Sequence, residues 1–263
     1  MSRGGPYIHG TASAEQKRLA ALNQLTNAPF LNFLDIRTTD RVLEVGSGLG
    51  ILASEAAQQA PQGYVVGVEY APAQISCTRV ERPNLRFLRG DAHFLPFTDN
   101  HFDVVYCRYL LEHVRDPLQV LYEKRRVLKS GGRAFAQENN MRMVVFDPDC
   151  PHFDALLPKF CELQDLLGGD ALIGKRLFAL FRAAGFRNIE LSYQPEIHVA
   201  GNPTFQPWID NFIGLLEGAS GLLVAHHLAT TAEIEAVAVE LRLLRSRDDA
   251  SGLFHWNRAT GVK

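Results

Sequence analysis

Several features that would assign this chain to a familiar class are missing from its sequence. Its 27 lysines and arginines are scattered and balanced by 29 acidic residues, so the net charge of −2 offers no basic patch for a nucleic acid backbone. The four cysteines include no C-x-x-C pair, which argues against a zinc site or a disulfide framework. We therefore expect a small-molecule partner, no nucleic acid partner, and a reduced cytoplasmic setting.

Long apolar runs are also missing. No stretch approaches the roughly 20 apolar residues that cross a membrane, and the N-terminus lacks the pattern of a signal peptide. The 263 residues, 46% of them hydrophobic, are enough for one large α/β domain or for such a domain with a helical cap. We expect a cytoplasmic protein without a membrane partner, and a homo-oligomer is left open.

One stretch organises the rest of the chain, V-L-E-V-G-S-G-L-G at residues 42–50. Residues that favour β-strands run into glycines at every second position, and an Ala-rich helix is predicted at 51–60. Glycines permit positive φ and close approach of a ligand, and a helix N-terminus offers unpaired N–H groups. The pattern predicts a site for an anionic or strongly polar ligand on Gly46, Ser47 and Gly48.

The glycine loop alone leaves the ligand open. A nucleotide, a dinucleotide and S-adenosylmethionine (SAM) can all be bound this way, and a plain strand-to-helix turn is the structural alternative. The third glycine of a dinucleotide fingerprint is replaced by Ile51, and no G-K-[ST] follows, which excludes a Walker-type phosphate loop.

Two acids follow at the ends of the next predicted strands. Strand 64–69 ends in Glu69, and strand 85–88 is followed by Asp91. Because the carboxyl ends of parallel strands border one crevice, Glu69 can accept hydrogen bonds from ribose hydroxyls, unless it is only a surface acid. Asp91 can accept the exocyclic amine of an adenine, with the Ala92 N–H on a ring nitrogen, or it only caps a turn.

Strands alternating with helices predict a doubly wound, parallel α/β sheet. Further strands are predicted at 102–107, 133–138, 187–193 and 252–262, and further helices at 117–128, 172–184 and 231–245. We expect Pro29 to end an N-terminal helix, residues 139–170 to be irregular, and the glycines at 214–221 to interrupt the chain before the last helix.

The motifs, taken in order, resemble those of the class I SAM-dependent methyltransferases, closest to the small-molecule type that includes the ubiquinone and menaquinone biosynthesis enzymes. They are V-L-E-V-G-S-G-L-G, V-V-G-V-E, G-D-A-H-F-L-P-F, F-D-V-V-Y-C-R-Y-L-L-E-H-V and L-K-S-G-G-R. The resemblance implies a Rossmann-like sheet of seven strands, the last one antiparallel, with SAM as the cofactor.

The resemblance also implies the cofactor contacts. SAM would lie over Gly46 to Gly48, with its ribose on Glu69, its adenine beside Asp91 and Ala92, and its amino acid end near Cys107 and Arg108. The remaining predicted cofactor residues are Tyr7, which would close on the methionine carboxylate, and Glu44, Tyr70 and Gln74.

No metal is predicted. Some metal-dependent relatives carry an acid three residues before the Glu-His pair, and that place is Tyr109 here, which leaves Glu112 and His113 without a third ligand. For an oxygen nucleophile, His113 is the predicted general base, with His9, His152, His226 and His227 as alternatives.

We expect an N-terminal helical lid at 1–36, a SAM-binding core at 37–200 with its insert at 139–170, a helical cap over an apolar pocket at 201–250, and a final strand at 251–263. The predicted function is methyl transfer to an O, N or C atom of a small, largely apolar molecule, such as a secondary metabolite. A protein or RNA methyltransferase, a nicotinamide-dependent oxidoreductase and a catalytically silent SAM-fold protein are the alternatives.

Overall fold

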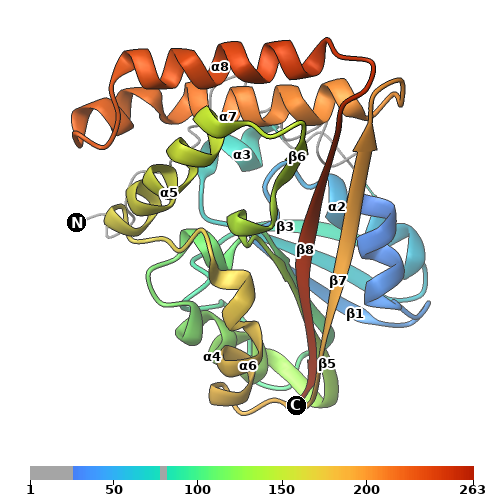
Figure 1. Ribbon diagram of the computed structural model, residues 1–263. Coiled ribbons are helices and arrows are strands. Elements are labelled where there is room, and N and C mark those ends of the chain that lie inside the picture. The colour runs from blue at the N-terminus through green and yellow to red at the C-terminus, as the bar shows by residue number, and fades with distance from the viewer. Residues whose placement is uncertain (1–25, 78–81) are drawn as a thin grey trace. The chain divides into compact units, whose positions relative to one another are not determined.

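The computed structural model describes residues 26–77 and 82–263, and the chain divides into two compact units (Figure 1). The first, which we call the sheet unit, comprises Thr26–Glu138, Ile173–Gln194 and Asn257–Lys263. The second, the helical unit, includes Asn139–Leu172 and Pro195–Trp256.

The sheet runs in the order β3-β2-β1-β4-β5-β8-β6, and β7 pairs with β8. Strands β1 to β5 are parallel, and β8 is antiparallel to β5 and β6. The strand order turns back between β1 and β4, so their carboxyl ends border the crevice where open α/β sheets bind ligands. The bounds are β1 Arg41–Val45, β2 Tyr64–Glu69, β3 Leu85–Arg89, β4 Phe102–Arg108, β5 Leu128–Glu138, β6 Val145–Asp147, β7 Arg187–Val199 and β8 Ser251–Val262.

Helices cover both faces of the parallel strands. Side chains alternate along β4, so Tyr106 joins the cluster with helical residues 26–34 and α2, whereas Val105 and Cys107 join the cluster with α4 and α6. A buried cluster on each face of the sheet confirms the doubly wound α/β architecture. Besides the helical residues 26–34, the helices described in this unit are α2 Ile51–Gln59, α3 Pro72–Cys77, α4 Pro117–Val127 and α6 Leu177–Ala183, with the 3₁₀ turns η1 Leu111–His113 and η3 Ile173–Arg176.

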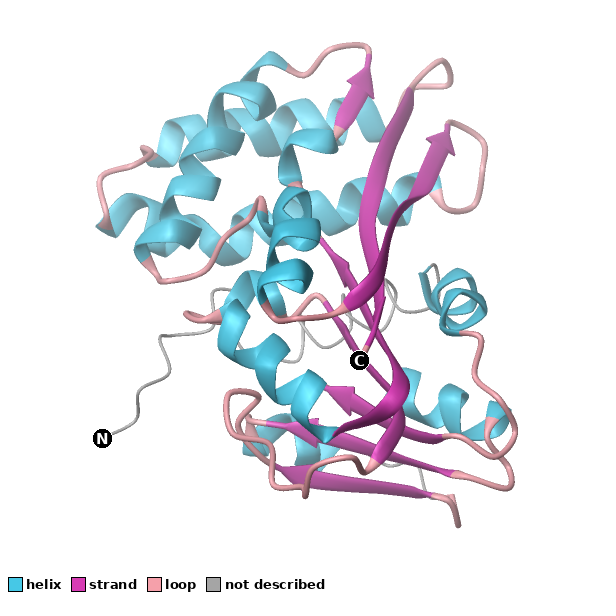
Figure 2. Ribbon diagram, turned by 90° about the horizontal axis from the view of Figure 1, so that it is seen from below, coloured by secondary structure: helices cyan, strands magenta, loops and turns pink. Residues whose placement is uncertain are grey.

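The helical unit is held together by aromatic side chains. Phe146 and Phe212 pack around Trp208 with ring centroids 5.3 and 5.0 Å from it, and Phe153 lies against both phenylalanines. Helices α7 and α8 lie side by side in Figure 1, and Figure 2 shows the prevalence of helix in this unit. Its elements are η2 Met141–Met143, α5 Pro151–Leu166, α7 Phe205–Ala225 and α8 Thr231–Arg245.

Three sequence predictions about helices are wrong. Residues 139–170 are not irregular, because α5 occupies much of that stretch and buries Leu156, Phe160 and Leu163. The glycines at 214–221 do not break the helical structure, since α7 continues through them. Residues 26–34 form one helix that includes Pro29, and Phe30 next to it is completely buried.

In the described part of the chain the sheet has eight strands rather than the seven predicted, because the short β6 pairs with the far end of β8. The predicted antiparallel last strand is confirmed as β8. Within residues 26–77 and 82–263, no helix combines the length and the apolar character that a membrane crossing needs.

Candidate functional site

The glycine loop connects β1 to α2 in a left-handed conformation. Gly46, Gly48 and Gly50 have φ values of 79°, 51° and 74°, which only glycine adopts at low cost. The N–H groups of Gly46 and Ser47 donate to the Val68 carbonyl on β2, with N···O distances of 2.8 and 3.0 Å. The loop is therefore fixed against the neighbouring strand just before α2 begins.

Glu69 lies directly beside this loop. Its Oε2 accepts the Gly48 N–H at 2.9 Å, and its Oε1 accepts the Ala71 N–H at 2.8 Å. The structure thus brings together the two motifs that the sequence placed at neighbouring strand ends. Both bonds orient the carboxylate along the edge of the loop.

The two other predicted residues after β2 differ in their surroundings. A Cβ atom added to Gly48 would lie 3.0 Å from Gln74 Oε1, so the Gln74 side chain reaches the glycine loop. Tyr70 is 50% exposed. Both lie near Glu69, at the same edge of the sheet.

Asp91 follows β3 and caps a turn, as one of its two predicted roles requires. Its Oδ1 accepts the backbone N–H of His93 at 2.9 Å and bonds to His93 Nδ1 at 2.7 Å. The Asp91 side chain is 43% exposed, so a ligand can reach its other oxygen. Ala92 packs against the core. The sequence analysis missed His93, although its place two residues after the acid is typical of such a turn.

Glu44, near the end of β1, and Arg108, at the end of β4, interact electrostatically. Glu44 is 4% exposed, and burial raises its pKa to about 8, while the Arg108 charge acts in the opposite direction. Arg108 donates to Thr26 Oγ1 at 3.1 Å and to Asn27 Oδ1 at 2.7 Å, and its guanidinium lies 5.5 Å from the centre of the Phe30 ring. A ligand carboxylate matches the Arg108 charge, and the Glu44 carboxyl, which this pKa keeps mostly protonated near neutral pH, can hydrogen-bond to a polar group of the ligand.

Cys107 lies in the core rather than at the edge. Its Sγ accepts a hydrogen bond from Lys124 Nζ at 3.1 Å and donates to Glu138 Oε1 at 3.7 Å, and burial raises the pKa of the thiol to about 12. Cys107 can therefore contact a ligand only through its backbone.

The turn after β4 is held by an acid that the sequence analysis missed. Glu138, at the end of β5, is fully buried and accepts the backbone N–H groups of Leu110, Leu111 and Glu112 at 3.1 to 3.4 Å. Burial raises the Glu138 pKa to about 7. No local pattern indicates this role, because the bonds join residues 26 to 28 positions apart.

His113 ends this turn. Its Nε2 lies 3.5 Å from Glu112 Oε1, and its side chain is 16% exposed. In the part of the chain that the structure describes, no group of three or more His, Cys, Asp or Glu side chains is arranged to hold a metal ion. Tyr7 and His9 lie outside the described residues.

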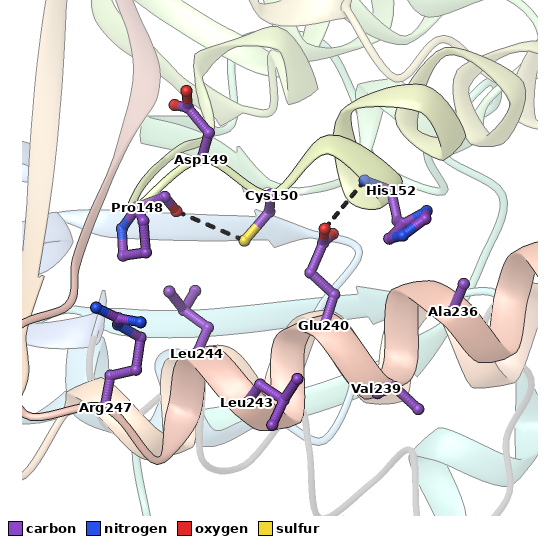
Figure 3. A pocket seen from close by; sticks show the side chains of 10 residues that line it. All are labelled: Pro148, Asp149, Cys150, His152, Ala236, Val239, Glu240, Leu243, Leu244 and Arg247. Atoms are coloured by element: carbon purple, nitrogen blue, oxygen red, sulfur yellow. Dashed lines mark hydrogen bonds between the residues drawn. The ribbon is translucent and has the colours of Figure 1, made fainter.

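A cavity of about 470 Å³ lies within the helical unit, between the start of α5 and one face of α8 (Figure 3). Glu240 on α8 accepts the backbone N–H groups of His152 and Phe153 at 3.1 and 2.8 Å and so caps α5. Of the alternative bases that the structure describes, only His152 lines this cavity, and no described residue among the predicted cofactor contacts does so. The lining residues are Pro148, Asp149, Cys150, His152, Ala236, Val239, Glu240, Leu243, Leu244 and Arg247.

Known proteins match both the sequence and the fold. A family model described as a methyltransferase domain matches residues 43–136, which contain the glycine loop and both acids. The demethylmenaquinone methyltransferase of Deinococcus radiodurans is 35% identical over 187 residues, which cover 65% of this chain and 73% of that protein. An uncharacterized methyltransferase of Schizosaccharomyces pombe is 31% identical over 155 residues, which cover 54% of this chain and 55% of that protein. This chain therefore spans only about half the length of that relative.

A crystal structure of a Bacillus halodurans protein assigned as a methyltransferase shares the fold. Its TM-score is 0.61 at 19% identity, and the alignment covers 91% of this chain and 99% of that one. At this identity the likeness concerns the fold alone.

Proposed function

Because this chain belongs to the class I SAM-dependent methyltransferases, we propose that it transfers the methyl group of SAM to an O, N or C atom of a small, largely apolar molecule. The observation that carries the site assignment is the bond between the Gly48 N–H and Glu69 Oε2, which joins the glycine loop to the acid after β2. The nicotinamide alternative is set aside, because the family uses SAM.

Buried polar atoms around the loop fit such a cofactor. Among the described residues, Ser47 Oγ is buried without a hydrogen-bond partner, and Glu44 Oε2 is buried near the Tyr106 hydroxyl. Buried polar groups are usually satisfied, so a ligand with hydroxyl and amino groups is a suitable partner for them. When bound, SAM supplies a methyl group that is activated on its sulfonium.

We assign the cofactor contacts along the edge of the sheet. The backbone of Gly46 to Gly48 would approach the cofactor closely, Glu69 would accept the ribose hydroxyls, and Asp91 with Ala92 would bind the adenine. The Arg108 charge and the Glu44 carboxyl would bind the amino acid end. Tyr7, Tyr70, Gln74 and Cys107 stay predicted contacts.

Methyl transfer from a sulfonium removes a positive charge, so the protein needs to stabilise little new charge and mainly supplies alignment and exclusion of water. For an oxygen nucleophile, we propose that a ring nitrogen of His113 accepts the acceptor's proton, with Glu112 beside the ring. A nitrogen or activated carbon nucleophile does not need this base.

The demethylmenaquinone methyltransferase relative supports a small-molecule acceptor. We also propose a division of labour along the chain, with a lid at residues 1–36, the main cofactor-binding segment at 37–200 and a cap at 201–250. A cytoplasmic location and assembly into a homo-oligomer are proposals of the same kind.

Calorimetric titration with SAM and with NADH tests the cofactor, and release of S-adenosylhomocysteine (SAH) tests the acceptor. The acceptors to compare are 1,4-dihydroxynaphthalene kept reduced, histamine, phosphoethanolamine, a lysine-containing peptide and a transfer RNA. We expect binding of SAM and turnover with one of the small molecules. Binding of NADH without SAM, or turnover with the peptide or the RNA alone, would overturn the proposal.

A further inference from the structure

The segment that carries the proposed adenine contact has little regular structure of its own. Residues 90–101, all of them described, connect β3 to β4 and contain neither a helix nor a strand, only an isolated bridge between Asp91 and Phe94. Most backbone N–H and C=O groups of such a segment need partners elsewhere in the protein. The position of Asp91 and Ala92 therefore depends on what holds the segment in place.

The partners come from one face of α4. Gln119, Glu123 and Arg126 stand at positions i, i+4 and i+7 of this helix, so their side chains leave it on the same side. Gln119 Nε2 donates to the His93 carbonyl at 3.1 Å. Glu123 Oε2 accepts the Leu95 N–H at 2.8 Å. The helix thus binds the backbone of the segment at two places.

Arg126 adds two further bonds to the segment. Its Nη2 donates to the Leu95 carbonyl at 2.9 Å, and its Nη1 donates to the Phe97 carbonyl at 2.7 Å. Its Nε and Nη2 also donate to the two oxygens of Glu123 at 2.7 and 2.8 Å, a bidentate pair that fixes the plane of the guanidinium. We call Gln119, Glu123 and Arg126 the loop clamp.

The loop clamp reaches Asp91 through His93. Gln119 binds the His93 carbonyl, while the N–H and the ring Nδ1 of His93 bond to Asp91 Oδ1 at 2.9 and 2.7 Å. These bonds hold one oxygen of the carboxylate and so set the direction of the other. All the residues involved belong to the sheet unit.

We propose that the loop clamp positions Asp91 and Ala92 for the adenine, and that Glu123 and Arg126 thereby set the preference of the protein for a 6-amino purine over a 6-oxo purine. The inference rests on the proposed function and deepens it, because it names positioning residues that select the base of the cofactor. None of the three clamp residues is assigned a contact with the cofactor itself.

The preference follows from donors and acceptors. Adenine offers an amino donor to the Asp91 carboxylate and a ring nitrogen acceptor to the Ala92 N–H, whereas a 6-oxo purine carries an acceptor and an N–H at these two places. A segment that could slide along the base would find new partners and accept both purines. A segment that is held in place cannot, so the wrong base leaves polar groups unpaired.

The test compares the affinities of SAH and S-inosylhomocysteine, its 6-oxo analogue, for the full chain by calorimetry. We expect the wild-type protein to bind SAH at least about tenfold more tightly, since two hydrogen bonds distinguish the ligands. In Arg126→Ala the ratio of the two affinities should fall to about twofold, and Glu123→Gln, a smaller change, should lower it in the same direction. A merely structural loss would lower the melting temperature and leave the ratio unchanged.

Arg125→Ala is the matched control. Arg125 is the neighbouring residue of α4, but it donates to the Gly185 carbonyl at 3.0 Å and not to the segment, so this variant should keep the wild-type ratio. Asp99 also meets Arg126, but its side chain is 65% exposed and such a pair contributes little, so we do not count it in the loop clamp. Equal losses of the ratio in Arg125→Ala and Arg126→Ala, or no loss in Arg126→Ala and Glu123→Gln, would overturn the proposal.

A double variant tests whether the loop clamp acts through Asp91. In Asp91→Ala protein, adding Arg126→Ala should change the ratio less than about twofold, because the acid to be positioned is already gone. A further loss as large as that of Arg126→Ala alone would contradict the positioning role. A wild-type protein that binds both ligands equally overturns this inference alone, whereas one that does not bind SAH at all overturns the proposed function as well.

Discussion

Two buried acids at the carboxyl ends of β1 and β5 make the stability of the protein depend on pH. Burial raises the pKa of Glu44 to about 8 and that of Glu138 to about 7, from an ordinary value of 4.5. The folded protein therefore binds these protons more tightly than the unfolded chain. Their contribution to stability is fully present below pH 4.5 and is lost as the pH rises through 7 and 8.

Glu44→Gln should remove much of this pH dependence, because the amide is neutral at every pH and keeps the shape of the acid. We expect the free energy of unfolding of the wild-type protein to fall by roughly 1 kcal/mol per pH unit for each acid over this range. The free energy of unfolding of the variant should fall less steeply with pH. Urea unfolding at pH 5.5, 7 and 8.5 measures both slopes, and equal slopes would contradict the assignment to Glu44.

The sequence could predict the position of those candidate site residues that stand at the end of a predicted strand. Glu69 and Asp91 each come at or just after a predicted strand, and the structure places Glu69 on Gly48. Glu123 and Arg126 could not be predicted, because the backbone groups that they bind lie 28 to 31 positions earlier in the chain and meet them only in the folded unit.

Glu69→Ala and Asp91→Ala should each weaken SAM binding about tenfold or more, since hydrogen bonds to charged groups contribute about 1.5–3 kcal/mol. Asp99→Ala is the control, because Asp99 is an exposed acid that pairs with Arg126 at 2.8 Å. Calorimetry gives the three dissociation constants. Unchanged affinity in both site variants would remove the site assignment.

At the scale of elements, the loop between β1 and α2 owes its path to left-handed glycines. Gly48→Ala and Gly131→Ala impose a similar backbone cost, because their φ values are 51° and 76°. An alanine Cβ at 48 would also lie 3.0 Å from Gln74 Oε1, whereas one at 131 meets nothing within 4 Å. SAM affinity should therefore fall at least tenfold in Gly48→Ala and stay unchanged in Gly131→Ala. The melting temperature should fall by a similar amount in both variants. Equal SAM affinity in the two would contradict a cofactor-binding loop.

The helices that the sequence analysis missed carry residues that usually interrupt helices. Pro158 lies within α5, and Gly214, Gly218 and Gly221 lie within α7. A glycine inside a helix costs about 1 kcal/mol relative to alanine, yet α7 buries Trp208 and seven other side chains. Burial in the folded unit outweighs local preference here, and that burial cannot be read from the local sequence.

At the scale of the whole molecule, the order of motifs was sufficient to predict the α/β class, the parallel strands and the antiparallel strand after them. The division into units was harder to predict, since the helical unit combines residues 139–172 with 195–256. Segments so far apart in sequence join one core only through packing.

SAM should stabilise the whole protein against heat, because it binds the folded state. At a concentration of 100 times its dissociation constant it adds about 2.7 kcal/mol, which corresponds to a rise in melting temperature of roughly 5–10 °C for a chain of this size. Differential scanning calorimetry measures the shift, with NADH as the control that should give none. A melting temperature that SAM leaves unchanged would contradict binding to the folded state.

The enclosure of Cys107 by Lys124 and Glu138 has a practical consequence for chemical labelling. Lys124 and Cys107 are both completely buried, and the high pKa of the thiol keeps it protonated near neutral pH. A maleimide or iodoacetamide reagent can therefore modify this sulfur only after the surrounding core has opened. The rate of alkylation of Cys107, followed by peptide mass spectrometry, reports how often the sheet unit opens in solution.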